Sequence, residues 1–228
     1  MKIFYRDSLV TLYLGDARDM SPKKGSVLVT DPPFNIGYSY KEYADKLSKE
    51  DYDALLDVVF KKWSDKVIIH YAEDVFRWAI RNREIPTKCV SWVYNSHLQR
   101  AWRMLAYFGV TPDFKKVGQP YKNPTDKRVK KLIAAGKQAR LYDWWEIQQV
   151  KNVNKEKTAH PCQMPLDVML RALGVLPSSA IIMDPFAGSG STLVAAKMLG
   201  MKAFGVEKSE TYCAIIAERL RNTKRRAP

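Results

Sequence analysis

The segment from Ala180 to Glu207 restricts the possible folds more than any other part of the chain. A short apolar run (180–183) predicts a buried strand, and a turn with two glycines leads into a helix predicted over 191–199. A second apolar run (202–206) predicts another strand, which ends on an acidic residue. Two strands joined by one helix pair in parallel through a right-handed crossover, so this segment predicts an α/β sheet.

The rest of the chain repeats this alternation of apolar runs and helical periodicity. Its 228 residues suit one domain with a single core. The pattern predicts a Rossmann-like α/β fold, in which a mostly parallel, doubly wound sheet has helices on both faces and binds ligands at the carboxyl ends of its strands. The further predicted strands are 26–30, 66–71 and 88–94, and the further predicted helices are 51–63, 73–83, 166–173 and 209–221.

The turn at 184–192 reads Asp-Pro-Phe-Ala-Gly-Ser-Gly-Ser-Thr and has the features of a nucleoside-binding loop. Gly188 and Gly190 allow the backbone to approach a ligand closely. Glu207 follows the start of the turn by 23 residues and ends the next strand, where a carboxylate can accept hydrogen bonds from both ribose hydroxyls. A dinucleotide motif is excluded because Leu193 stands where its third glycine would be, and a P-loop is excluded because its Gly-Lys-Ser/Thr is absent.

A second motif, Asp31-Pro32-Pro33-Phe34, directly follows the predicted strand 26–30. Its prolines stiffen the turn, so that a carboxylate, a carbonyl and an aromatic ring converge. The exocyclic amino group of adenine or cytosine is a poor nucleophile, because its lone pair is delocalised into the ring. Hydrogen bonds from that group to Asp31 and to the Pro32 carbonyl would favour a more tetrahedral nitrogen. Phe34 would stack on the base after it is flipped out of the duplex.

The charge of the chain indicates a polyanionic partner. There are 38 Lys and Arg against 24 Asp and Glu, a formal charge of +14. Between 112 and 157 the periodicity weakens, and twelve basic residues face five acidic ones. We therefore divide the chain into a catalytic half (1–111), a basic target-recognition insertion (112–157) and a cofactor-binding half (158–228). The candidate nucleic-acid contacts are Lys115, Lys116, Lys122, Lys127, Arg128, Lys130, Lys131 and Arg140.

Four aromatic residues interrupt this basic stretch, and they allow two interpretations. Tyr121, Tyr142, Trp144 and Trp145 could stack on bases beside cations that contact phosphates. Alternatively, the insertion is solvated and its tryptophans pack on the main domain.

Membrane insertion, disulfide bonding and metal binding are not expected. No apolar run has the length of a membrane span, and the first residues lack the apolar core of a signal peptide, so we expect a cytoplasmic protein. The three cysteines, Cys89, Cys162 and Cys213, are widely spaced and form no C-x-x-C pair, which argues against both a disulfide framework and a zinc site.

With these motifs, the chain resembles the amino-group DNA methyltransferases of restriction-modification systems and phages. Their signatures are an Asp-Pro-Pro-aromatic catalytic loop and an Asp-Pro-Phe-x-Gly-Ser-Gly-Ser/Thr cofactor loop. The catalytic motif comes first here, with the basic segment between the two, as in the β group of that family. The resemblance implies S-adenosyl-L-methionine as cofactor, the methyltransferase version of the Rossmann-like fold, double-stranded DNA as partner, and the cytoplasm of a bacterial or phage-infected cell, at the nucleoid.

The resemblance also implies a set of cofactor contacts. Gly15-Asp16-Ala17 is similar to an N-terminal loop beside the cofactor, and 160–165 is similar to the family segment His-Pro-Thr-Gln-Lys-Pro. Cys162 and Met164 depart from that segment. The implied cofactor-binding residues are Asp16, Ala17, Asp31, His160, Gln163, Asp184, Phe186, Gly188, Ser189, Gly190, Ser191, Thr192, Glu207 and Lys208.

Several alternatives remain open. Cytosine N4 uses the same chemistry as adenine N6, although the family members that methylate it more often carry Ser before Pro-Pro, whereas this chain has Asp31. RNA as substrate, a catalytically silent binding protein with the same fold, and a homodimer on a palindromic site are also compatible with the sequence. Pro161-Cys-Gln163 matches the nucleophile tripeptide of cytosine-C5 methyltransferases, but it precedes the cofactor loop, whereas in that class it follows.

Overall fold

The computed structural model describes residues 1–37, 39–40, 43–96, 100–151, 154 and 156–225. Its main element is a sheet of nine described strands in the order β1-β2-β13-β12-β3-β6-β8-β7-β11. These strands are β1 (Lys2–Arg6), β2 (Val10–Leu14), β3 (Ser26–Thr30), β6 (Lys66–His70), β7 (Lys88–Val93), β8 (Trp102–Phe108), β11 (Trp144–Glu146), β12 (Ile181–Asp184) and β13 (Ala203–Glu207). Two small two-stranded sheets lie apart from it, one of β4 (Ser39–Tyr40) and β5 (Tyr43–Ala44), the other of β9 (Gly118–Gln119) and β10 (Ala139–Arg140).

The centre of the sheet is parallel, which confirms the predicted fold class. Strands β2, β13, β12, β3 and β6 run side by side in one direction. Only β1 and β8, among the described strands of this sheet, run the opposite way. Every residue of β3 and of β6 is buried, as continuous apolar runs in the middle of a covered sheet require. We call the edge where the parallel strands end the carboxyl edge, and the opposite edge the amino edge.

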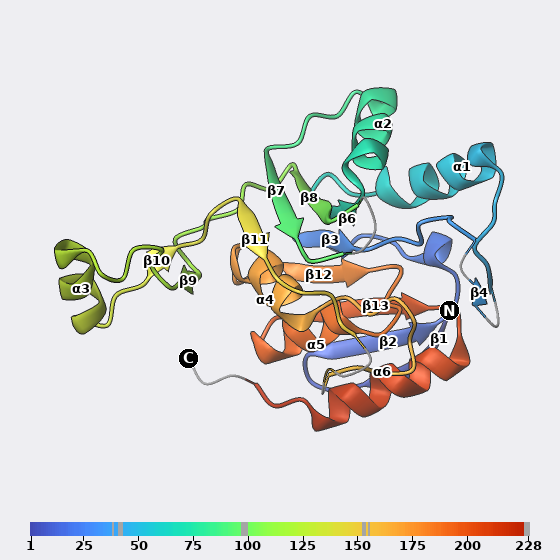
Figure 1. Ribbon diagram of the computed structural model, residues 1–228. Helices are drawn as coiled ribbons and strands as arrows, with labels where there is room; N and C mark the ends of the chain where they lie inside the picture. The colour runs from blue at the N-terminus through green and yellow to red at the C-terminus, as the bar shows by residue number, and fades with distance from the viewer. Residues whose placement is uncertain (38, 41–42, 97–99, 152–153, 155, 226–228) are drawn as a thin grey trace.

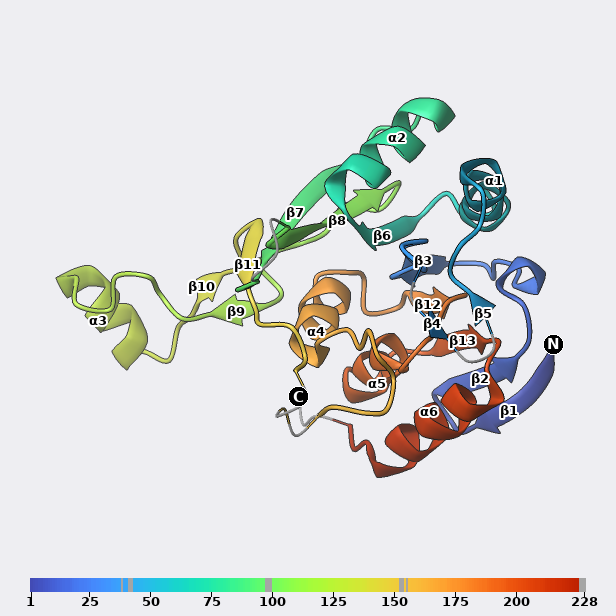
Figure 2. The same cartoon turned by 45° about the vertical axis from the view of Figure 1, so that its right-hand side comes forward.

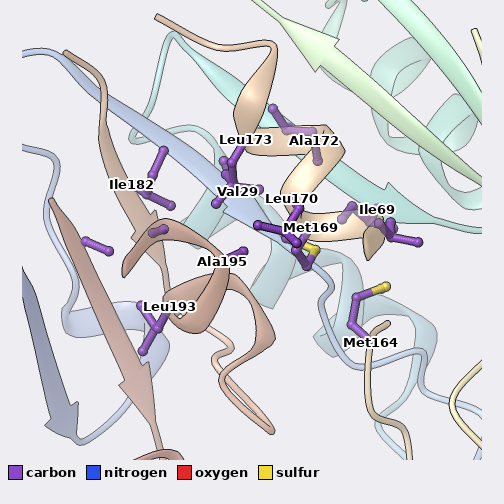
Figure 3. Packing of buried hydrophobic residues seen from close by; sticks show 14 of the residues in the cluster. Val29, Ile69, Met164, Met169, Leu170, Ala172, Leu173, Ile182, Leu193 and Ala195 are labelled. Atoms are coloured by element: carbon purple, nitrogen blue, oxygen red, sulfur yellow. The ribbon is translucent and has the colours of Figure 1, made fainter. Parts of the chain in front are cut away.

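Helices cover both faces, so the sheet is doubly wound as predicted (Figure 1). One face packs against α1 (Lys49–Phe60) and α2 (Ala72–Asn82). The other packs against α4 (Leu166–Gly174), α5 (Ser191–Met198) and α6 (Glu210–Asn222). Figure 3 shows the core on this second face, where side chains of α4 and α5 meet Val29 and Ile182 of the sheet. None of the described helices is both long and apolar enough to span a membrane.

Residues 118–140 form a basic arm that is attached at the amino edge. Because β8 is antiparallel to β6, its last residue Phe108 pairs with Lys66, the first residue of β6. The chain therefore leaves the sheet on the side opposite the carboxyl edge. The arm consists of β9, α3 (Lys127–Ala134) and β10, and it stands away from the rest of the molecule (Figures 1 and 2). No residue of α3 is buried.

After the arm the chain returns to the main sheet, which separates the two interpretations of the aromatic residues. Strand β11 pairs in parallel with β7, and Trp145 is completely buried. Trp145 therefore belongs to the core and is not a stacking platform for bases. Trp144 points outward, and Lys122 lies 4.0 Å from the centre of its ring. Residues 152–153 and 155 of the predicted insertion lie outside the described part of the chain.

Candidate active site at the carboxyl edge

A cavity of about 570 Å³ opens at the carboxyl edge, between α1 and α6. Loops that follow β2, β3, β12 and β13 line it, as expected for ligand sites in sheets of this kind. The structure thus brings the two sequence motifs together, although about 150 residues separate them in the chain. The predicted site residues that line the cavity are Asp16, Ala17, Asp31, Pro32, Pro33, Phe34, His160, Phe186, Gly188, Glu207 and Lys208.

The glycine loop (184–192) begins at a carboxylate that joins the two motifs. Asp184 is buried, and its Oδ1 accepts hydrogen bonds from the Thr30 hydroxyl at 2.7 Å and from the Phe186 amide at 3.1 Å. Burial raises the pKa of Asp184 to about 6, while its hydrogen bonds oppose that shift. Asp184 does not line the cavity, so its hydrogen bonds hold the loop from the protein interior.

Two glycines give the glycine loop its shape. Gly188 has φ +54° and Gly190 has φ +80°, both in the left-handed region. A Cβ on Gly190 would lie 2.7 Å from Cγ2 of Ile216, so α6 can approach the loop only because this residue has no side chain. A Cβ on Gly188 would lie 3.2 Å from Nε2 of His160.

Glu207 lies opposite the glycine loop and connects it to the end of β13. Its Oε2 accepts the Gly188 amide and its Oε1 accepts the Ser209 amide, each at 2.8 Å. Burial raises the pKa of Glu207 to about 6, and these backbone donors favour the carboxylate form. A carboxylate oxygen can accept more than one hydrogen bond, so Glu207 can still receive hydroxyl donors from a ligand in the cavity.

Other predicted cofactor residues are buried behind the cavity lining. The Ser191 hydroxyl donates to the Met164 carbonyl at 2.7 Å, and Oε1 of Gln163 accepts the Thr158 amide at 2.8 Å. These contacts tie the glycine loop to the segment that precedes α4. The predicted residues outside the lining are Gln163, Asp184, Ser189, Gly190, Ser191 and Thr192.

Asp16 and His160 both line the cavity, the first as a charged group and the second as a neutral one. The hydrogen bond from Arg18 holds the pKa of Asp16 at about 2, so this residue is a carboxylate. Burial, aided by Lys157 and Arg219, lowers the pKa of His160 to about 4, so the imidazole is neutral near pH 7. The imidazole lies 4.5 Å from the ring of Tyr212 on α6, a residue outside the predicted set.

The proline loop (31–37) carries the other motif, and the partly buried Asp31 is its first residue. Nη1 of Arg103 lies 3.7 Å from Oδ2 of Asp31. Among the described residues, Oδ1 of Asp31 has no hydrogen-bond partner. Burial raises the pKa of Asp31 to about 7, with Arg103 opposing the shift and Asp184 adding to it. The carboxyl group is therefore in an unusual state for a residue that lines a cavity.

Side chains from α1 and β6 hold the rest of the proline loop. The Tyr52 hydroxyl donates to the Pro33 carbonyl at 2.6 Å and lies 3.0 Å from Nε2 of His70. Because the hydroxyl proton is directed at Pro33, Nε2 of His70 donates to the hydroxyl oxygen. The ring of Phe34 lies 4.3 Å from that of His70 and 5.0 Å from that of Tyr71.

A reciprocal pair of hydrogen bonds closes the chain behind Phe34. Asn35 has φ +54°, and its side chain both donates to the Leu47 carbonyl and accepts the Leu47 amide. The buried Asp45 accepts the amides of Asn35 and Ile36. The two ends of this turn are thereby fixed next to the cavity.

The predicted nucleic-acid contacts do not gather at the cavity. All eight are exposed, and four of them, Lys127, Arg128, Lys130 and Lys131, lie on α3 in the basic arm. The arm belongs to the amino edge, whereas the cavity belongs to the carboxyl edge. Lys116 has a contact within the fold, since its ammonium donates to the Leu176 carbonyl at 3.0 Å.

Besides Tyr212, three residues at the site carried no recognisable signal in the sequence. Arg103, Tyr52 and His70 contact the proline loop, but each belongs to a different element, and none lies within a motif. Their importance depends on which strands are neighbours. Only the order β3-β6-β8 brings β6 and β8 beside Asp31.

The chain matches the model of the N6/N4 methyltransferase family, which is described as DNA methylase. The match covers residues 26–218, from β3 to α6, and so includes both motifs and most of the chain.

Curated relatives include two type II methyltransferases. M.ScaI from Streptomyces caespitosus is 28% identical over an alignment of 261 positions, gaps included, which covers 96% of this chain and 84% of that protein. M.BglII from Bacillus subtilis is 24% identical over 93% of this chain and 69% of that protein.

Solved structures share the fold. The cytosine-N4-specific PvuII DNA methyltransferase has a TM-score of 0.68 at 20% identity, over 96% of this chain and 88% of that one. The complex of M1.HpyAVI with S-adenosylmethionine has a TM-score of 0.58 at 19% identity, over 92% of this chain and 100% of that one.

Proposed function

Because the chain belongs to the N6/N4 DNA methylase family and is therefore an S-adenosylmethionine-dependent DNA methyltransferase, we propose that its target is N6 of adenine in double-stranded DNA. The observation that carries this proposal is the position of Asp31. Its carboxyl group borders the cavity that the glycine loop and Glu207 also line. A flipped base and a bound nucleoside would meet in that cavity.

The residues of the cavity fit the cofactor. Gly188 leaves room for a ligand at the backbone, Glu207 can accept the ribose hydroxyls, and Phe186 offers an apolar surface. Asp16 provides a carboxylate, and the neutral His160 does not repel a cationic group. When bound, S-adenosylmethionine supplies a methyl group that the target nitrogen takes directly, while the sulfur keeps the electron pair of the broken bond.

The proline loop would prepare the target amine. Asp31 and the Pro32 carbonyl accept hydrogen bonds from the amino group, which concentrates the lone pair on nitrogen. The nitrogen becomes positively charged as it gains the methyl group, and Asp31 can take the proton that it then loses. Phe34 stacks on the flipped base and compensates for part of its lost stacking in the duplex. The protein contributes position and charge complementarity without a covalent intermediate.

Adenine is favoured over cytosine by the residue before Pro-Pro. The chain has Asp31, whereas the cytosine-N4 enzymes of the family more often have Ser at this position. A partly buried carboxylate with a raised pKa is suited both to accept a hydrogen bond from the amine and to take up a proton near neutral pH.

The target base can be identified by product analysis. The purified protein is incubated with tritiated S-adenosylmethionine and mixed-sequence duplex DNA, and the digested nucleosides are separated by chromatography. We expect the label in N6-methyladenine. Label in N4-methylcytosine would overturn the choice of base and keep the chemistry. Absence of label from DNA, but not from RNA, would change the substrate class, and binding of both ligands without any label would mean a silent protein.

We further propose that the insertion (112–157) binds DNA, mainly through the phosphates that its arm contacts. Helix α3 carries four cations and no acidic residue, and its side chains are available because none is buried. The arm lies at the amino edge and the cavity at the carboxyl edge. The arm would therefore contact DNA well beyond the flipped base. A palindromic target would allow a second protomer to bind the same duplex.

Charge reversal tests the arm. Lys127→Glu, Lys130→Glu and Lys131→Glu together should weaken duplex binding by at least about tenfold and reduce the dependence of log affinity on log salt by roughly 3. A matched control reverses three exposed lysines elsewhere, Lys2, Lys24 and Lys202. Equal losses in both variants would mean that only net charge matters. Gel filtration with and without duplex tests the homodimer.

A further inference from the structure

Arg103 lies inside a ring of aromatic side chains next to Asp31. It belongs to β8, and only 12% of its side chain is exposed. The guanidinium carbon lies 4.5 Å from the centre of the Phe34 ring, 5.4 Å from that of Trp92 and 5.8 Å from that of Tyr71. Its Nη1 is 3.7 Å from Oδ2 of Asp31. One guanidinium thus contacts both the acid and the aromatic ring of the catalytic motif.

This arrangement contributes little to stability. Withdrawing a guanidinium from water is costly, and a buried ion pair at this distance does not fully offset that penalty. In addition, Nε of Arg103 is buried without a hydrogen-bond partner among the described residues. Arginine remains charged even here, because Asp31 raises its pKa against the effect of burial. A permanent cation at a place where it is poorly solvated indicates a role in the chemistry.

Arg103 is the cation that faces Asp31. From β12, the carboxyl group of Asp184 repels a negative charge on Asp31. Directly after β7, Tyr94 bonds to Arg103 and is neutral, because burial raises its phenol pKa. From β6, burial lowers the pKa of His70, so its imidazole is neutral as well. Burial and Asp184 therefore favour protonation of Asp31, and Arg103 opposes them.

We propose that Arg103 is a positioning residue that keeps Asp31 a carboxylate and holds Phe34 in place, so that the target amine meets a hydrogen-bond acceptor. The proposal rests on the proposed role of Asp31 in catalysis. A protonated Asp31 would present a hydroxyl donor to an amine that needs acceptors. The base would bind, but its nitrogen would not be activated. Arg103 would thus set the pH range in which the enzyme works.

The test is the pH dependence of methylation in a single turnover, with saturating cofactor and duplex, for Arg103→Gln and Arg103→Lys. The glutamine variant loses the charge and keeps a polar group, and the lysine variant keeps the charge. For Arg103→Gln we expect the acid limb of the rate to move up by at least about one pH unit. With a shift of one unit, its rate should be about fivefold below wild type at pH 7 and approach wild type near pH 9. For Arg103→Lys, which keeps the charge, the acid limb should stay close to that of wild type.

Arg100→Met is the matched control. Arg100 also stacks on an aromatic ring, 4.3 Å from the centre of Tyr71, but it is exposed and no ion pair joins it to Asp31. Its pH profile should match wild type. An equal loss for Arg103→Gln at every pH would overturn the proposal and leave Arg103 a purely structural role. Near-normal turnover by Asp31→Ala would instead refute the proposed function itself, so the two failures are distinguishable.

Discussion

The glycine loop and the proline loop meet in one cavity, but different interactions hold them. The glycine loop is held by its own backbone amides, which donate to carboxylates, and by close packing of Gly190 against Ile216. The motif of the proline loop is held by polar side chains of other elements, chiefly Arg103 of β8 and Tyr52 of α1. In the proposed function, the first loop is a rigid receptor for the cofactor, whereas the second carries a carboxyl group whose ionisation its neighbours control.

This difference assigns separate functions to the two loops. Changes in the glycine loop should act on cofactor affinity and on stability. Changes around the proline loop should act on the rate of methyl transfer at saturating cofactor. Each of the following experiments can break this division.

The largest effect is expected for Asp31→Ala. The variant removes the acceptor of the target amine, so the rate constant of methyl transfer should fall by at least about a thousandfold. The dissociation constant of the cofactor should change by less than about threefold. Single-turnover methylation and calorimetric titration measure the two quantities. A parallel loss of cofactor affinity would show that the two loops do not act separately.

Gly190→Ala should act mainly on stability. The new Cβ would lie 2.7 Å from Cγ2 of Ile216 at a φ of +80°, so we expect the free energy of unfolding to fall by about 2–4 kcal/mol and cofactor affinity to weaken. Gly136→Ala is the control, because it has φ +69° with nothing within 4 Å of the added Cβ and should cost about 1 kcal/mol. Urea denaturation measures both variants, and equal losses would exclude close packing as the cause.

The two loops should also differ in their dependence on pH. Asp31 has a pKa of about 7 and must be ionised to accept the amine, so the rate should fall as the pH drops through 7 and be about tenfold below its plateau at pH 6. Glu207 has a pKa of about 6, so cofactor affinity should fall as the pH drops through 6, about one unit below the pH at which the rate falls. Cofactor titrations at each pH distinguish the loss of affinity from the loss of rate. If both fell at the same pH, separate functions for the two loops would be contradicted.

The smallest effect is expected for Tyr52→Phe. Loss of the hydroxyl removes the bond to the Pro33 carbonyl, which should slow methyl transfer about three- to tenfold without changing cofactor affinity. Tyr5→Phe removes a hydroxyl that bonds to Asp7 near the surface and serves as the control. A loss of cofactor affinity in the Tyr52 variant would contradict a role confined to the proline loop.

The sequence was sufficient to predict the glycine loop because its requirements are local. Strand, turn, helix and acidic residue follow one another within 28 residues, and the structure has them as β12, α5 and β13. The strand before the proline loop was predicted for the same reason. Asp31 and Phe34 were found as a motif, and the structure places both beside the cavity.

The partners of the proline loop could not be predicted, because they depend on strand order. Strand β8 was not predicted, and neither was its antiparallel direction, which places Arg103 beside Asp31. The basic segment was recognised by its charge, but its attachment to the amino edge follows from the direction of β8 as well. Composition alone could not distinguish the buried Trp145 from the exposed Trp144.

The order of the strands also has a consequence for the synthesis of the protein. Strands β12 and β13 lie between β2 and β3, although they come from the last fifty residues and their neighbours come from the first thirty. While the ribosome makes the middle of the chain, β2 and β3 each have an open side with unpaired amides and carbonyls. The centre of the sheet fills only when the carboxyl-terminal segment emerges. The half-made protein is thus an aggregation-prone species, and its final segment is the one that closes the sheet.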